Sequence, residues 1–522
     1  MTVLDPMRVT GPDTFPSSKT SPPLVIAGSI TLFIVALPLF YLTKRALEVN
    51  SETLRIVFWR FKTVEIFITT FSLAIGTALI ATLFGIGIAW ALNSVELPGL
   101  GLIRALVILP IAIPSYVFAY AWLSLGFLPK GFLAALFVLT LTTTPYVTLA
   151  ALAAFRRIDS SQLDVAQTLG LNPIATFMRV TLPQIRNAVA SGALLVALYV
   201  LSDFGAVSLL GVDTFTRAIQ NAYQGSFDRS SASILALLLV TISTLVIYAE
   251  SSTRQRSRVF SSSVRIVKRA PFNPSNRVKI FSLSFIFVYL LVALIMPLAL
   301  LISRFISRPK PIDFTSLTQA SISTISVSLF GAFLALLLAL PVAIMAAQRS
   351  RLGLWSERGV LLVHALPGIV MGLALVSFGS DFPGIYQTLG LLAFAYAILF
   401  LARSVGSTRS AISKVPQNLT EIAATLGQTR SKIFLRVTLP LAAPGVLAGT
   451  LLVFLSSMKE LPATLMLRPT GFETLSTEIW NNTSIFRFSE AAPYALLLIA
   501  IAAIPTFLIS RPDRDLEKGE IQ

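Results

Sequence analysis

The chain has no cysteine and a single histidine, His364, among its 522 residues. Without cysteine there can be no disulfide, no thiolate nucleophile and no iron–sulfur ligation, and one imidazole cannot form a histidine metal cluster. No segment matches the G-x-x-x-x-G-K-[ST] pattern of a phosphate-binding loop. We therefore expect no catalytic residues and no cofactor on this chain, and any nucleotide hydrolysis would belong to another chain.

Charge is also scarce. Charged residues make up 12% of the chain and hydrophobic residues 55%, whereas a soluble domain usually carries about 25% charged residues. Such a composition cannot cover the surface of a water-soluble globule of this size. At about 20 apolar residues per helical crossing, a dozen crossings would use roughly 240 residues and leave no room for a large soluble domain. The composition therefore predicts an all-α membrane protein.

The few charged residues are mostly basic, and the net charge is +17. A basic chain can bind nucleic acid, but in a chain this apolar, basic loops mark the cytoplasmic side and contact anionic lipid head groups. We therefore expect membrane lipids as partners and no nucleic acid.

Apolar runs predict about twelve transmembrane helices. The first run is longer than the core of a signal peptide, and no small-residue cleavage site follows it. The runs cover residues 23–42, 66–91, 104–123, 132–153, 189–210, 232–249, 279–303, 320–347, 359–378, 387–402, 444–467 and 491–510.

Lysine and arginine set the expected orientation. With both termini in the cytoplasm, the basic connector 250–279 and the basic loop 403–443 lie inside, as the rule requires. The basic segment 43–65 would be outside, and an interfacial amphipathic helix there would account for it. The expected divisions are a cytoplasmic tail (1–22), a first six-span unit (23–249), the connector (250–279), a second six-span unit (280–510) and a cytoplasmic tail (511–522).

The two units are copies of one another. Asp164–Pro183 and Glu421–Pro440 are identical at ten of twenty positions, at an offset of 257 residues. The same offset places Leu109-Pro110 on Leu366-Pro367 and Asp203 on Glu460. Because six spans is an even number, the two copies enter the membrane in the same orientation, and transporters place their sites between such repeats.

Each repeated segment has the pattern of two short helices joined by glycine. Gly170 and Gly427 suit the left-handed residue that ends the first helix. Asn172, followed by proline, suits the start of the second helix in the first copy, and Thr429 does so in the second. The apolar stripe on the second helix either packs against the protein's own spans or docks into a soluble partner. Two copies of it favour a partner that is itself a symmetric dimer.

The spacing acid-x-A-x3-G-x9-[IV]-x-L-P in both copies resembles the cytoplasmic signature of binding-protein-dependent ABC importer permeases. The first copy departs from it slightly, with Asp164 for glutamate and Val165 for alanine. The resemblance implies the type I permease fold in a bacterial inner membrane, two copies of an ABC ATPase that hold ATP and Mg, and a periplasmic or extracellular binding protein. It also implies that the segments are coupling helices, with Asp164, Ala166, Gly170, Phe177, Pro183, Glu421, Ala423, Gly427, Phe434 and Pro440 as coupling residues.

Within that family, the chain resembles the fused, two-half permeases for ferric iron. The runs Lys459–Thr464 and Glu490–Ala495 carry this resemblance. Thiamine, sulfate and polyamine importers share the architecture and remain alternatives. An ion-driven secondary transporter is a further alternative, and it would need titratable groups within its spans.

Two acids fall inside apolar runs. A carboxylate within a membrane is costly unless it is paired or functional, and Asp203 and Glu460 occupy equivalent positions. As a hard cation, ferric ion prefers oxygen ligands, so both acids are candidates for the substrate path. Alternatively, Glu460 pairs with Lys459, and Asp203 caps a helix break. Pro110, Pro114 and Pro367 break the third and ninth spans, and Pro110 and Pro367, at matched positions, could expose carbonyl groups to the path; the residues of any metal site are left open.

Overall fold

The computed structural model describes residues 21–49, 55, 59–94, 99–126, 129–155, 158, 160–225, 229–259, 276–307, 311–348, 350–363 and 365–510. Within these residues all regular secondary structure is helical. Ten helices are long and apolar enough to cross a membrane, and two bent helix pairs raise the number to twelve if each pair is one span. The all-α membrane class and the number of spans are thus confirmed.

The first half of the chain contains all the elements up to the connector. They are α1 (Pro22–Leu47), α3 (Phe61–Ser94), α4 (Leu100–Ile108), η1 (Leu109–Ala112), α5 (Ser115–Leu123), α6 (Phe132–Phe155), α7 (Ser160–Thr168), α8 (Pro173–Thr176), η2 (Phe177–Thr181), α9 (Leu182–Ser202), α10 (Gly205–Leu209), α11 (Phe215–Gln220), η3 (Asn221–Gly225) and α12 (Arg229–Val259).

The second half repeats this order. Its elements are α13 (Asn276–Leu290), η4 (Leu291–Ile295), α14 (Met296–Ile306), α15 (Phe314–Ala347), α16 (Arg351–Val363), α17 (Gly368–Asp381), α18 (Leu389–Ser413), α19 (Gln417–Thr425), α20 (Arg430–Ile433), η5 (Phe434–Thr438), α21 (Leu439–Met458), α22 (Pro462–Leu467), α23 (Leu475–Ser484) and α24 (Phe488–Ser510). Six elements from α6 to α10 recur at the offset of 257, each starting at the matching residue.

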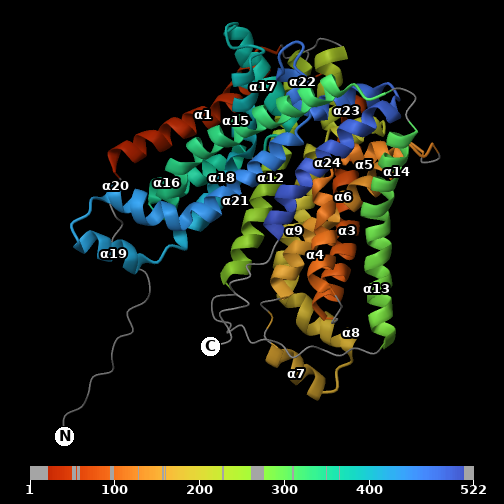
Figure 1. Cartoon of the computed structure of the whole chain (residues 1–522), viewed down its shortest axis with the longest axis vertical. Coiled ribbons are helices and arrows are strands. Elements are labelled where there is room, and N and C mark those ends of the chain that lie inside the picture. The colour runs from red at the N-terminus through yellow and green to blue at the C-terminus, as the bar shows by residue number, and fades with distance from the viewer. Residues whose placement is uncertain are drawn as a thin grey trace.

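Each half is built around three packed helices. In the first half α3, α6 and α9 pack against one another, and in the second half α15, α18 and α21 do so. The two groups diverge from a common region that contains α5, α17, α22 and α23 (Figure 1). The leading helix of each half is exchanged: α1 packs on α15, α16 and α17, whereas α13 and α14 pack on α3, α4 and α5.

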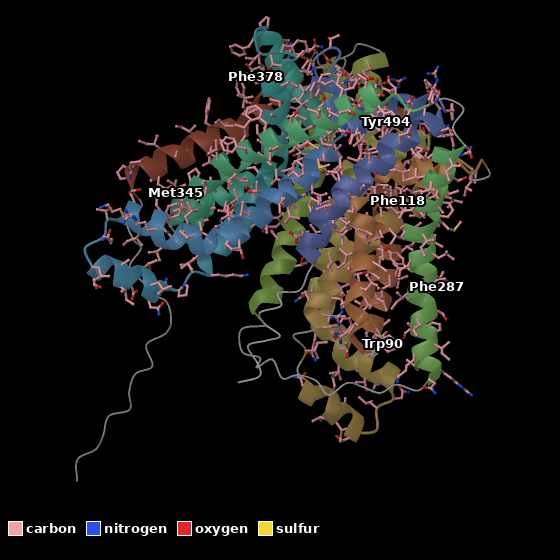
Figure 2. The ribbon with its side chains drawn as sticks, in the orientation of Figure 1. Trp90, Phe118, Phe287, Met345, Phe378 and Tyr494 are labelled. Atoms are coloured by element: carbon pink, nitrogen blue, oxygen red, sulfur yellow. The ribbon has the colours of Figure 1, made fainter. Side chains whose placement is uncertain are left out.

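The apolar surface is arranged as a membrane requires. Phe118 on α5 is fully buried between the halves, whereas Phe287, at the outer edge of the bundle on α13, is 59% exposed (Figure 2). In the hydrocarbon layer an exposed phenylalanine faces lipid, so its exposure carries no penalty.

The basic segment 43–65 contains the end of one membrane-spanning helix and the start of the next. α1 runs on to Leu47 and α3 begins at Phe61, and most of the stretch between them lies outside the described residues. Three of its described bases, Lys44, Arg45 and Lys62, are paired with acids. Lys44 Nζ lies 2.8 Å from Asp381, and Lys62 Nζ lies 2.7 Å from Asp213. These ion pairs reduce the local positive charge in a segment that the orientation rule would not place outside.

Two of the predicted spans end earlier than expected. The runs 189–210 and 444–467 predict continuous helices, but α9 ends at Ser202 and α21 at Met458. Apart from Asp203 in the first copy and Lys459 and Glu460 in the second, the sequence remains apolar beyond both ends, so a hydropathy window runs on through the break. In each copy the chain turns at the acid, and a new short helix, α10 or α22, begins two residues later.

The third and ninth spans are bent at proline. α4–η1 meets α5 at 89°, and α16 meets α17 at 99°. Pro114 and Pro367 immediately precede the second helix of each pair with nearly the same extended backbone, ψ 147° and 153°. The offset of 257 instead equates Pro367 with Pro110, which lies inside η1. That pairing was wrong, because the second copy has four more residues between its bend and α18 than the first copy has between its bend and α6.

Candidate functional site

The two repeated segments, residues 160–183 and 417–440, form the predicted pair of short helices. Gly170 and Gly427 lie between the helices with left-handed φ values of +80° and +74°. Asn172 Oδ1 accepts a hydrogen bond from the Ala175 amide at 2.7 Å, as expected of a cap. In the second copy the Thr429 carbonyl accepts from the Ile433 amide at 2.9 Å.

A π-helical turn joins each second helix to the span that follows. These turns are Phe177–Thr181 and Phe434–Thr438, at the same offset of 257. The predicted stripe on this helix divides between two environments. Phe177 is half-buried and packs against the core of its own half, whereas Met178 is exposed. Packing against the protein's own core is therefore seen for Phe177, and docking of the exposed side chains on a partner stays a prediction.

The repeated segments also expose apolar side chains that the sequence reasoning missed. Leu169 is 77% exposed and Leu426, its equivalent, is 73% exposed. Two more equivalent pairs are exposed in the same way: Val165 with Ile422, and Met178 with Leu435. Their sequence signal was an apolar residue retained at both matching positions of an otherwise polar helix.

The other predicted coupling residues differ in exposure. Ala166 is buried and Ala423 is partly buried, and Phe434 is half-buried like Phe177. Glu421, Gly427, Pro183 and Pro440 are exposed, with each proline at the second position of its span. The side chain of Asp164 lies outside the described part of the structure.

A cavity of about 210 Å³ lies between the two halves, at the helix breaks. Asp203, Glu460 and Pro367 line it, so the structure brings three of the four predicted path residues together. Pro110 does not line it; the neighbouring Ile111, Ile113 and Pro114 do. The further lining residues include Tyr146, Tyr199, Ser202, Phe204, Arg403, Ser456 and Lys459.

Asp203 caps the helix break beside this cavity. Its Oδ1 accepts hydrogen bonds from the amides of Ala206 and Val207 at 3.1 and 3.2 Å, and its other oxygen accepts one from the Ser115 hydroxyl. The side chain is 7% exposed. A buried carboxylate with three donors is stabilised without a cation, so the capping alternative is what this geometry shows.

Glu460 has the same role in the second copy with fewer donors. Its Oε1 accepts from the Ala463 amide at 3.0 Å. Gly368 lies directly against this carboxylate, and a Cβ there would require the carboxylate to shift. The predicted pair with Lys459 is not formed, because Lys459 Nζ donates to the Ile111 carbonyl of the first half at 2.9 Å.

Contacts between the halves close the side of this cavity remote from the repeated segments. The Tyr116 hydroxyl donates to Ser476 at 2.8 Å, and the Tyr120 hydroxyl donates to the Phe488 carbonyl at 2.5 Å. The rings of Phe204 and Trp480 pack at 5.2 Å. Phe204 also lines a second cavity, of about 220 Å³, so it forms part of the wall between the two.

No group of three or more acidic or histidine side chains in the described part of the chain is placed to hold a metal ion. His364 lies outside that part. The cavity thus brings two carboxylates, two cations and several hydroxyls to one place between pseudosymmetric halves. This arrangement suits the passage of a small polar solute.

Comparison with known proteins agrees with the repeat. The model of the binding-protein-dependent transport system inner membrane component family matches residues 81–256 and, again, 335–512. Each match contains one repeated segment and one of the two cavity carboxylates. The duplication inferred from the offset therefore corresponds to two copies of one family domain.

Several curated proteins are similar to this chain. An Fe(3+)-transport system permease protein of Haemophilus influenzae is 32% identical over 498 residues, which cover 92% of this chain and 98% of that protein. A molybdate/tungstate transport system permease protein of Pyrococcus furiosus is 30% identical over 33% of this chain and 70% of its own length. A probable sulfate transport system permease protein of Chlorokybus atmophyticus is 25% identical over 43% of this chain and 86% of its own.

These similarities span both halves, and they agree with the helical membrane fold and the cavity between the repeats. The chain is a multi-pass transport subunit, without enzymatic activity of its own, in the inner membrane. It belongs to the family of binding-protein-dependent transport system inner membrane components, as a permease with both halves fused in one chain.

Proposed function

We propose that this permease imports ferric iron, delivered by a binding protein outside the membrane and driven by ATP hydrolysis on two copies of a separate ATPase. The observation that carries the substrate is the 32% identity with the Fe(3+)-transport permease, which extends over 98% of that protein. Relatives whose names specify molybdate, tungstate or sulfate align with a smaller part of this chain.

The repeated segments are the ATPase contacts in this proposal. Six crossings separate them, if each bent pair is one span, so they lie on the same side of the membrane. Each exposes the same three apolar positions to water, which favours burial against a partner. Asp164, Ala166, Gly170, Phe177 and Pro183, with their equivalents in the second copy, shape this contact, and ATP and Mg stay on the ATPases.

The orientation follows from the same contact. If the repeated segments face the cytoplasm, counting crossings places both termini there as well. The contacts Tyr116–Ser476 and Phe204–Trp480 then lie toward the outside and close the cavity to the binding protein. Binding of ATP would draw the two ATPases together, rock the halves and separate these contacts, so that the cavity opens outward.

In this proposal Asp203, Glu460 and Pro367 line the path of the substrate. Both carboxylates reach the cavity, although part of their hydrogen-bonding capacity is used in capping. A hard trivalent cation prefers the oxygen atoms that these two residues offer.

The experiment is reconstitution of the chain in liposomes with its ATPase and its binding protein. Uptake of radioactive iron should require ATP and both partners, and an imposed proton or sodium gradient should not replace them. Gradient-driven uptake by the chain alone would instead establish an ion-driven secondary transporter. ATP-driven uptake of sulfate or thiamine, with none of iron, would retain the importer and overturn the substrate.

A further inference from the structure

Two cations line the same cavity as the two carboxylates, and both come from the second half. Lys459 Nζ donates to the Ile111 carbonyl, and the Arg403 guanidinium donates to the Ser456 hydroxyl. Within the described residues neither cation forms an ion pair with an acid. Their positive charge is therefore not neutralised by a carboxylate contact of their own.

The repeat shows that these cations belong to one wall only. By the offset of 257, Ser202 is equivalent to Lys459 and Tyr146 is equivalent to Arg403, and all four residues line the cavity. The carboxylates occupy matching positions in both halves, but the first half has hydroxyl groups where the second has cations. The cavity therefore has one acid from each half, whereas both of its cationic side chains come from the second half.

Counting hydrogen-bonding groups gives the same picture. Asp203 already accepts three hydrogen bonds, whereas Lys459 and Arg403 each use one donor of the three and five that they carry. The formal charges of the two acids and two bases cancel, so the cavity offers no net attraction to a bare trivalent cation. An ion of uncompensated charge is costly within a membrane.

We propose that the cavity takes iron as a complex with an oxygen-rich anion, whose oxygen atoms lie against Lys459 and Arg403. This inference rests on the proposed function and specifies the cargo of the same site. The anion lowers the charge that must cross and supplies oxygen ligands beyond the two carboxylates. The hydrogen bonds that Lys459 and Arg403 would donate to the anion are charge-assisted, and the planar Arg403 guanidinium suits two oxygens of a phosphate or a carboxylate. Both an inorganic oxyanion and a carboxylate chelator have this chemistry.

The test uses the complete transporter in liposomes, with iron and phosphate carrying separate radioactive labels. Phosphate should enter together with iron in a constant ratio. Lys459→Gln and Arg403→Gln should each lower the uptake of both labels by about tenfold, since a hydrogen bond to a charged group contributes about 1.5–3 kcal/mol. Repeating the assay with labelled citrate in place of phosphate distinguishes a chelator from an inorganic oxyanion.

The controls distinguish a loss of positive charge from a loss of folded protein and from a failure of the proposed function. Lys459→Arg should retain most of the uptake, and Lys130→Gln, in the second cavity, should leave the ratio of the labels unchanged. Arg403→Gln serves if Lys459→Gln fails to insert, because Arg403 is exposed. Iron uptake at the wild-type rate without either anion, or in both glutamine variants, would overturn the inference while sustaining iron import. No iron uptake by the wild type with any anion would overturn the proposed function itself.

Discussion

Gly368 lies against the carboxylate of Glu460, so closely that a Cβ on the glycine would overlap Oε1. The first half solves the same packing problem differently. Ser115, like Gly368, is the first residue of the helix after the bend, and its hydroxyl donates to the shorter Asp203. The glycine leaves room for the longer Glu460 side chain, and the serine hydroxyl reaches the shorter Asp203 side chain. Both helix breaks are packed in this way.

Gly368→Ala should therefore disturb the second break. The added methyl group must displace the Glu460 carboxylate or α17, and overpacking of this kind typically costs about 1–3 kcal/mol. We expect a lower rate of ATP-driven uptake per inserted molecule. The double variant Gly368→Ser with Glu460→Asp reproduces the arrangement of the first half and should recover uptake.

The matched control for this variant is Gly406→Ala on α18, because nothing lies within 4 Å of a Cβ there. It should insert and transport like the wild type. Normal uptake by Gly368→Ala would show that the carboxylate can move without consequence, and the close contact would then have no functional meaning.

Removing both cavity charges should separate transport from capping. Asp203→Asn and Glu460→Gln keep an oxygen that can accept the amide hydrogen bonds of the helices that follow, so the breaks should persist. We expect the double variant to insert normally and to lose iron uptake. A poor yield of protein whose surviving molecules still transport would assign the two acids a purely structural role.

Replacing Gly170 or Gly427 by valine should uncouple the protein from its ATPase. A β-branched residue at these left-handed φ values costs about 1–2 kcal/mol and shifts the first short helix relative to the second. Asparagine tolerates this conformation, so Gly170→Asn and Gly427→Asn should restore coupling. The measurement is ATPase activity stimulated by the reconstituted permease; full stimulation in the valine variants would contradict the prediction.

The exposed leucines of the repeated segments should contribute directly to ATPase binding. Leu169→Gln combined with Leu426→Gln removes two side chains that would each contribute about 1.5–3 kcal/mol when buried. We expect ATPase co-purification to fall strongly, with insertion unchanged. Thr168→Ala and Thr425→Ala, at the last residues of the two helices that Leu169 and Leu426 follow, provide the control. Equal loss of binding in the threonine pair would mean that the helices, not their apolar side chains, had been disturbed.

The absence of cysteine makes the proposed outer closure easy to test, since introduced cysteines are the only ones in the chain. In the double variant Phe204→Cys with Trp480→Cys, a short bifunctional thiol reagent should join the two halves in the resting state, because the native rings lie 5.2 Å apart. Trapping the ATPases in their ATP-bound state should prevent the reaction. Equal cross-linking in both states would mean that these residues do not separate during transport.

Much of the fold could be predicted from the sequence, because the signals that define it are local or repeated. Hydropathy located the spans, and an exact offset located the two copies. The breaks after Ser202 and Met458 could not be predicted in the same way, because the chain is apolar on both sides of the few charged residues at each turn. The correspondence of Pro114 with Pro367 was also hidden, since four additional residues between the bend and α18 of the second copy change the offset from 257 to 253.

For the site, chemistry was easier to predict than contacts. The equivalence of Asp203 and Glu460 followed from the repeat, and both line one cavity. The place of Lys459 did not follow, because its carbonyl partner Ile111 lies 348 residues away in the chain. Proximity in sequence suggested a pair with Glu460, whereas the packing of the two halves sends the side chain across the interface.

The exchange of the leading helices has a consequence for the synthesis and folding of the protein. α1 leaves the ribosome first, but α15, α16 and α17, on which it packs, are made last among its neighbours. During synthesis α1 therefore lies in the lipid without these three neighbours while some 270 residues are added between Leu47 and Phe314. Fusion of the halves into one chain keeps this helix tethered close to its eventual neighbours throughout that interval, where a separate subunit would have to find them by diffusion.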